Sequence, residues 1–238
     1  MIPVLNLLQG ITDKLNKSTN LEGQFIPNET SILALNRAQT KLVLKKVGLS
    51  NNYQLGLDSF KKRYEDLQIL IEPYEKLTLT SVGDLLNSYK VEEPENLLLP
   101  IDLYVLATKG NCKDRILDVI EIVKHGDLQS KLKSPHYQPN FEYQETLATI
   151  SGNNIFIYSD PKNSFILTSL SISYLRNPKY IDIAGYIHLD GTPSITTDCE
   201  LESYLEDELL NLAVEELAMN TGNQELVQYS IQKSKEDE

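Results

Sequence analysis

The spacing of the apolar residues changes twice along the chain, and this change limits the possible folds more than any other feature of the sequence. Apolar residues recur at helical spacing in residues 1–72, whereas residues 73–197 hold runs of β-branched and aromatic residues separated by turns. Helical spacing returns in residues 198–233, and residues 234–238 form a polar tail that we expect to be flexible. This order predicts an α+β fold with N-terminal helices, a central, mostly antiparallel β-sheet with hairpins, and an acidic C-terminal helix. We expect residues 1–238 to form a single domain, since domains commonly hold about 100–200 residues.

Residues 4–17, 28–47 and 58–70 predict three N-terminal helices. In the second of these, Asn28 suits an N-cap and Gly48 suits the residue after the helix end. Asn36 and Gln39 lie inside its apolar stripe. Because buried amides must be hydrogen-bonded, we expect both to be structural amides that fix neighbouring backbone. Ligand recognition is the alternative role for them.

Runs of β-branched and aromatic residues predict the strands of the central part. Residues 101–107 and 116–123 are such runs, and Gly110-Asn111 marks a turn between them. Residues 155–158 and 165–175 predict a hairpin with a long second strand. Alternation places these side chains on one side of that strand: Ile166, Thr168, Leu170, Ile172 and Tyr174.

The C-terminal helix, expected from about Cys199 to Asn220 with Asp198 as its N-cap, carries two apolar stripes. The first stripe comprises Leu201, Leu205, Leu209, Leu212 and Met219. The second comprises Leu210, Val214 and Leu217, about 140° away around the helix axis. A helix that is apolar on two sides needs two partners. We expect the first stripe to face the protein's own core and the second to contact a neighbouring subunit or partner, although both stripes can also be internal.

The distribution of charge argues against a surface that grips nucleic acid. The formal net charge is −12, and 12 acidic but only two basic residues follow from Asp198 onward. Binding to phosphates normally requires a basic patch, and the doublet Lys45-Lys46 and the triplet Lys61-Lys62-Arg63 are too short to form one. We therefore expect DNA to move past this protein without being held.

The sequence holds none of the familiar catalytic or cofactor motifs. Phosphate-loop, dinucleotide-binding, zincin and Gly-x-Ser-x-Gly patterns are absent. His125, His136 and His188 have no second ligand at metal-binding spacing. Cys112 and Cys199 are expected to be free and mostly buried thiols. We expect no enzyme activity, no cofactor and no metal, and neither a membrane span nor a secretory leader.

Three segments together resemble one family of proteins. They are residues 28–39 (NETSILALNRAQ), residues 173–179 (SYLRNPK) and residues 199–213 (CELESYLEDELLNLA), with residues 100–104 (PIDLY) between the first two. In this order they resemble the head–tail connector (neck ring) proteins of tailed bacteriophages, particularly those of crAss-like phages. The sequence departs from the family pattern at Glu202, where a proline is common, and in the long stretch from Tyr180 to Thr197.

The resemblance implies a structural virion protein that assembles into a homo-oligomeric ring of about twelve copies. Such a ring would be made in the host cytoplasm and would lie at the head–tail junction below the portal protein, in contact with neighbouring ring and tail proteins. Genomic DNA would pass through its lumen during packaging and ejection. The alternative is a non-catalytic adaptor that binds another protein through its acidic C-terminal helix. An enzyme with an unrecognised site is a third possibility.

Overall fold

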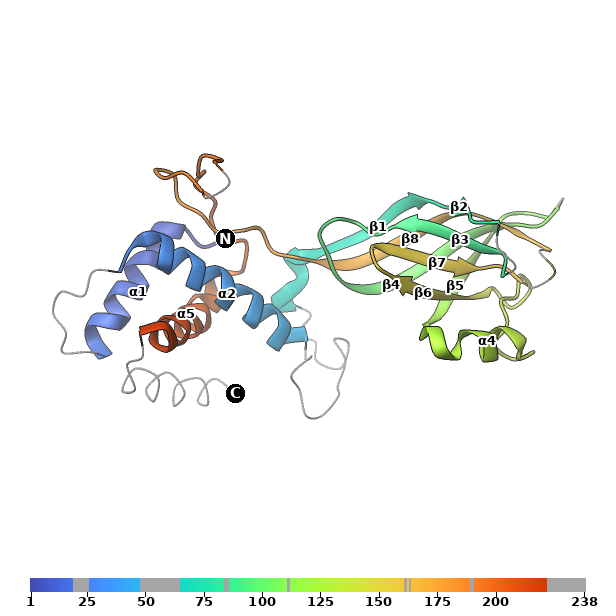
Figure 1. Cartoon of the computed structure of the whole chain (residues 1–238), viewed down its shortest axis with the longest axis horizontal. Coiled ribbons are helices and arrows are strands. Elements are labelled where there is room, and N and C mark those ends of the chain that lie inside the picture. The colour runs from blue at the N-terminus through green and yellow to red at the C-terminus, as the bar shows by residue number, and fades with distance from the viewer. Residues whose placement is uncertain are drawn as a thin grey trace. The chain divides into compact units, whose positions relative to one another are not determined.

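The chain folds into two compact units in the computed structural model, which describes residues 1–18, 26–47, 65–83, 86–110, 112–160, 162, 164–188 and 191–221. One unit combines Met1–Leu70 with Asn177–Glu238, and the other comprises Ile71–Arg176 (Figure 1). The fold class is α+β, as the order of patterns predicted. Residues 177–197, which we expected in the β part, belong with the helices.

The helical unit is built around α1 (Val4–Ser18), α2 (Asn28–Val47) and α5 (Glu206–Thr221). Helix α5 packs against both α1 and α2, which run beside it in Figure 1. The apolar stripe of α2 is buried, including Ile32, Leu35 and Leu42. Of the predicted third helix, residues 65–67 are helical and continue into η2 (Gln68–Leu70), while residues 58–64 lie outside the described residues.

Asp198 caps a different helix from the one that the sequence predicted. Its Oδ1 accepts a hydrogen bond of 2.9 Å from the backbone N–H of Val4, the first residue of α1. Ile2 and Cys199 also pair as an isolated antiparallel bridge, which brings residue 198 beside the start of α1. The C-terminal helix begins later, at Glu206, after the short 3₁₀ helix η3 (Ser203–Leu205). The C-terminal helix begins late because of a tertiary contact: the chain before η3 is extended and pairs with residues at the N-terminus.

The second unit contains one sheet. Its strands are β1 (Ile71–Thr78), β2 (Thr80–Ser81), β3 (Ser88–Glu92), β4 (Leu97–Thr108), β5 (Arg115–Ile122), β6 (Glu145–Ser151), β7 (Asn154–Tyr158) and β8 (Ile166–Arg176). Their spatial order is β1-β8-β4-β5-β6-β7-β3-β2. Neighbouring strands are antiparallel except β5 and β6, which are parallel and are joined through α4 (His125–Lys133). A parallel pair requires such a crossover connection.

The sheet closes on itself. Strands β1 and β2, which occupy its two ends, are separated only by Leu79, so both ends belong to one continuous segment. The inner face holds the unit's main core, in which Val105, Leu117 and Leu170 are fully buried. The outer face of β4 and β5 keeps several apolar side chains exposed.

The predicted hairpin between residues 155–158 and 165–175 was wrong. Strand β7 pairs with β6 and β3, whereas β8 pairs with β1 and β4. Strand β8 pairs along its whole length with β4, a strand of similar length. The expected common face of β8 is also divided: Ile166 and Thr168 are exposed, but Leu170, Ile172 and Tyr174 are buried. A register irregularity between Leu106 and Ala107 of the paired β4 accounts for the change of face.

Candidate functional site

Asn36 of α2 joins this helix to the extended segment that follows β8. Its Oδ1 accepts a hydrogen bond from the backbone N–H of Ile181 at 2.8 Å, and its Nδ2 donates to the carbonyl oxygen of Ile181 at 2.9 Å. Nδ2 also donates to the carbonyl oxygen of Ile32 at 2.8 Å. The Asn36 side chain therefore satisfies both the N–H and the C=O group of the buried residue Ile181. An amide on an apolar stripe is expected to make this type of contact.

Gln39 lies one turn farther along α2 and is less well satisfied. Its Nε2 donates to the carbonyl oxygen of Lys179 at 3.3 Å, a long hydrogen bond. Its Oε1 is buried and has no hydrogen-bond partner among the residues that the structure describes. An unpaired buried acceptor costs free energy, so Gln39 contributes less to the stability of this contact than Asn36 does.

Lys179 connects the same extended segment to the residues before η3. Its backbone N–H donates to Oε2 of Glu200 at 3.1 Å, and its Nζ lies 3.0 Å from Oε1 of the same carboxylate. The Glu200 side chain is almost fully buried, so this pair is only partly screened by water. Glu200, expected in the first turn of the C-terminal helix, instead fixes the backbone at residue 179.

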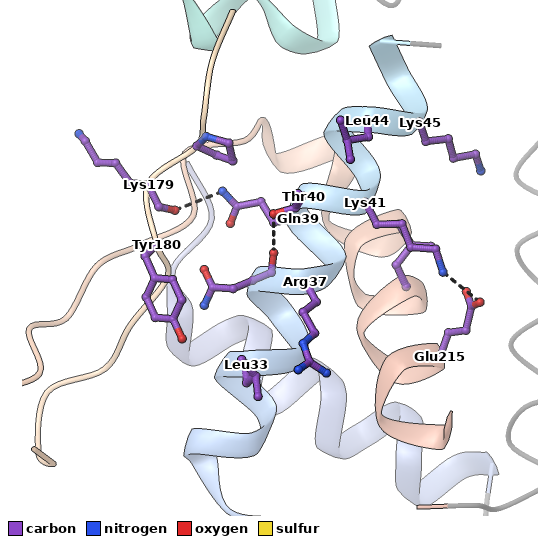
Figure 2. Close-up of a pocket in the computed structure, with 13 residues that line it drawn as sticks. Leu33, Arg37, Gln39, Thr40, Lys41, Leu44, Lys45, Lys179, Tyr180 and Glu215 are labelled. Carbon is purple, nitrogen blue, oxygen red and sulfur yellow. Dashed lines mark hydrogen bonds and ion pairs between the residues drawn. The ribbon is translucent and has the colours of Figure 1, made fainter. Parts of the chain in front are cut away.

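A pocket of about 910 Å³ lies against these contacts and is called here the α2 groove. Figure 2 shows Lys179 and Tyr180 on the extended segment at one side of it, and Leu33, Arg37 and Lys41 along α2 at the other. Its apolar lining comes from Leu33, Leu44, Pro178, Tyr180 and Leu212. The volume is within the range of ligand pockets, and the mixture of apolar wall and polar rim is typical of a recognition surface.

The rim of the α2 groove is basic, although the chain as a whole is acidic. Its charged lining residues are Arg37, Lys41, Lys45 and Lys179 on the positive side and Glu215 on the negative side. Lys41 lies 3.1 Å from Glu215 and Lys45 lies 3.6 Å from Glu208, so α5 carboxylates neutralise these two cations. Within the described parts of the chain, Arg37 forms no ion pair, and its charge is available at the exposed rim.

The second stripe of the C-terminal helix is covered by the chain itself. Leu210, Val214 and Leu217 are exposed by only 4%, 3% and 1% of their surface. Leu210 packs over Gly10 of α1 so closely that a Cβ atom at Gly10 would lie 2.7 Å from the Leu210 Cδ1. Helix α5 has two internal partners, α1 and α2, and these account for both stripes. The expected subunit interface at these three residues is therefore wrong. Met219, expected in the first stripe, lies outside the side chains described.

The acidic residues of α5, which an adaptor would present to a partner, are largely engaged inside the unit. Glu208 lies 2.8 Å from Lys46 of α2, and Glu216 lies 3.8 Å from Lys41. Lys46 also lies 3.4 Å from the buried Asp66, which accepts a hydrogen bond from Tyr204. This charged network joins α2 to α5 and leaves fewer free carboxylates for a partner protein.

The histidines and cysteines are separated in the structure. His125 and His136 are exposed, and His188 contacts Asp182 at 3.1 Å. In the part of the chain that the structure describes, no three His, Cys, Asp or Glu side chains are grouped as a metal site would require. Both cysteines are free: Cys199 is buried, whereas Cys112 is exposed, contrary to the expectation that both would be mostly buried. Burial raises the pKa of the Cys199 thiol.

Asp182 organises the loop between the extended segment and Asp198. Its carboxylate accepts hydrogen bonds from the hydroxyl of Tyr186 and from the N–H of Ile183, and it faces His188. Burial alone would raise the pKa of Asp182, but these partners together lower it. The pairings Asp182–Thr197 and Ile187–Pro193 close the loop into an irregular hairpin.

Sequence reasoning singled out Asn36 and Gln39 but not the segment that they hold. Lys179 and Tyr180 are exposed polar residues after a strand, and no periodicity distinguishes them. The structure brings them to α2 through backbone hydrogen bonds, which leave no signal in side-chain patterns. Among the described helices, none is long and apolar enough to cross a membrane. No family model and no curated protein matches this chain.

Proposed function

We propose that this protein is a structural virion protein that forms a ring in the head–tail connector of a tailed bacteriophage. In this proposal about twelve copies stack below the portal, contact the neighbouring ring and tail proteins, and surround the path of the genomic DNA. The protein acts as a scaffold and a passage rather than as a catalyst.

One observation carries the proposal. The three segments that resemble neck ring proteins are far apart in the sequence, yet they meet in one place. Residues 28–39 contribute Asn36 and Gln39, residues 173–179 contribute Lys179, and residues 199–213 contribute Glu200 and Leu212. Hydrogen bonds and the α2 groove join residues 28–39, 177–179 and 199–213 within the helical unit, and residues 173–176 form the end of β8 in the other unit. Such a meeting is expected if the resembling segments are the shared structural centre of the family.

The charge of the chain is compatible with a passage for DNA. A net charge of −12 repels phosphates, and repulsion keeps DNA mobile where a basic surface would hold it. The lysines of α2 are paired with carboxylates of α5, so they do not form a free basic stripe.

The direct test is the mass and the location of the assembled protein. The full-length chain, purified at micromolar concentrations, should form a closed oligomer of about twelve times the 27.0 kDa chain, measured by native mass spectrometry. Electron microscopy should show rings, and antibodies against the protein should label the head–tail junction of virions. A chain that stays at 27.0 kDa at all concentrations and is absent from purified virions would contradict the proposal.

A further inference from the structure

The α2 groove has a complementary surface on the other unit of the chain. This surface, called here the β4–β5 face, lies on the outside of the closed sheet. Tyr104 of β4 is opposite Asp118 of β5, and Leu106 is opposite Ile116, so these side chains share one face. Their inward-pointing neighbours, Val105 and Leu117, are fully buried, which identifies the shared face as the outer one.

The β4–β5 face is apolar and exposed. Ile116 and Ile120 are exposed by 56% and 44%, and Tyr74, whose ring centre is 5.5 Å from that of Tyr104, is exposed by 61%. Large apolar side chains grouped on one outer face are typical of interaction surfaces. A closed sheet is convex on its outside, and a convex apolar face is suited to a concave groove.

The same face is acidic, whereas Arg37 is the cation at the groove rim that has no ion pair among the described residues. Asp102 and Asp118 are both exposed beside Tyr104. Desolvation, a hydrogen bond with Tyr74 and the charges of both carboxylates raise the pKa of the Tyr104 hydroxyl. Tyr104 is opposite Ser171 of β8, and Ser171 is opposite Lys76 of β1, so this cation lies two strands away from Tyr104. The α2 groove offers Arg37 at its rim, with Leu33, Leu44 and Tyr180 as apolar surface.

We propose that the α2 groove of one copy binds the β4–β5 face of a second copy, with Arg37 of the first copy facing Asp118 of the second. This inference rests on the proposed ring. The two surfaces are different patches of the same chain, so the contact is heterologous, and repeated heterologous contacts close into a ring when their rotation permits. Opposite charges select this pairing over groove-to-groove or face-to-face contacts, which would bring like charges together.

The test uses two charge reversals in the full-length chain. Arg37→Glu places a carboxylate at the groove, and Asp118→Lys places a cation on the face. Both residues are exposed, so circular dichroism should show folded variants. Each variant alone should remain at 27.0 kDa in native mass spectrometry under conditions where the wild type is a ring. A 1:1 mixture should restore the ring, because the new carboxylate of one variant then meets the new cation of the other, and the native pair of Arg37 and Asp118 forms at the alternate contacts.

Matched controls are Lys162→Glu and Glu95→Lys, two exposed charge reversals outside both surfaces, which should assemble as the wild type does. If the wild type forms rings and either single reversal does so equally well, the proposed pairing is overturned while the ring itself stands. The pairing is also overturned if both variants are monomeric but their mixture is not rescued. A wild type that never assembles overturns the proposed ring and this contact with it.

Discussion

At the scale of single residues, the two amides of α2 differ in what they satisfy. Asn36 pairs both backbone groups of the buried Ile181, whereas Gln39 makes one long hydrogen bond, and its Oε1 is unpaired within the described part of the chain. In the sequence both amides lie in one apolar stripe, and nothing in the sequence shows that their hydrogen bonding differs. The difference depends on which backbone lies opposite each amide, and that is set by residues 145 and 140 positions away.

We therefore expect substitutions at these two positions to have unequal effects. Asn36→Leu leaves the N–H and C=O groups of Ile181 unpaired and should lower the free energy of unfolding by about 2–4 kcal/mol. Gln39→Met keeps the side-chain volume, loses one weak hydrogen bond and removes an unpaired acceptor, so it should cost less than about 1 kcal/mol. Urea denaturation of both full-length variants measures the difference. Equal losses would show that Gln39 is as well satisfied as Asn36.

At the scale of elements, the sequence predicted helices better than it predicted strand partners. The spacing of apolar residues located α2, because all the residues of its buried face belong to one continuous helix. Strands β1, β2, β3 and β6 and helix α4 were not predicted. β1 is mostly exposed, including Tyr74 and Glu75, and so lacks the alternation that marks a half-buried strand. The pairing of β8 with β4 and β1 rather than with β7 is a property of the closed sheet and has no local signal.

The candidate site, too, could be predicted only in part from the sequence. Two apolar stripes on α5 correctly indicate two partners, but amphipathicity does not say whether a partner belongs to the same chain. Here both partners, α1 and α2, are internal. The groove itself depends on how α2 meets residues 178–180, which are far from it in sequence. A groove formed by distant segments cannot be predicted from periodicity alone.

At the scale of elements, the burial of Leu210 leads to a testable prediction about the packing of α5 on α1. Leu210→Asp would place an unpaired carboxylate between α5 and Gly10 of α1. It should lower the free energy of unfolding by about 3–5 kcal/mol, through lost packing and desolvation of the charge. Thermal unfolding followed by circular dichroism measures this. Ile195→Asp introduces the same charge at a strongly exposed position and should unfold like the wild type. A Leu210→Asp chain of normal stability would show that α5 can leave α1 without loss of the fold.

At the scale of the whole molecule, ion pairs between helices determine which charges are neutralised. The acidic excess lies from Asp198 onward, and three of its twelve carboxylates, Glu208, Glu215 and Glu216, face the lysines of α2. Lys41 and Lys45 are four residues apart on α2, and Lys46 follows Lys45 directly. These three lysines would form a short basic patch if the carboxylates of α5 and Asp66 did not pair with them. Helix α5, together with Asp66, therefore neutralises three neighbouring lysines of α2.

Removing the carboxylates of α5 should make lysines of this patch available to DNA. The wild type should show no binding to duplex DNA at physiological salt, because its net charge is −12. The triple variant Glu208→Gln, Glu215→Gln and Glu216→Gln should bind weakly, because it frees Lys41 and Lys45 while Lys46 stays paired with Asp66. The logarithm of its affinity should fall with the logarithm of salt concentration with a slope of about −2, as expected for roughly two phosphate contacts. Fluorescence anisotropy with labelled duplex measures both, after circular dichroism has established that the variant is folded. The matched control replaces Glu92, Glu93 and Glu95 of the other unit by Gln and should not bind, although its net charge changes equally. Binding by the wild type, or equal binding by both triple variants, would show that the pairing between α2 and α5 does not govern the interaction with DNA.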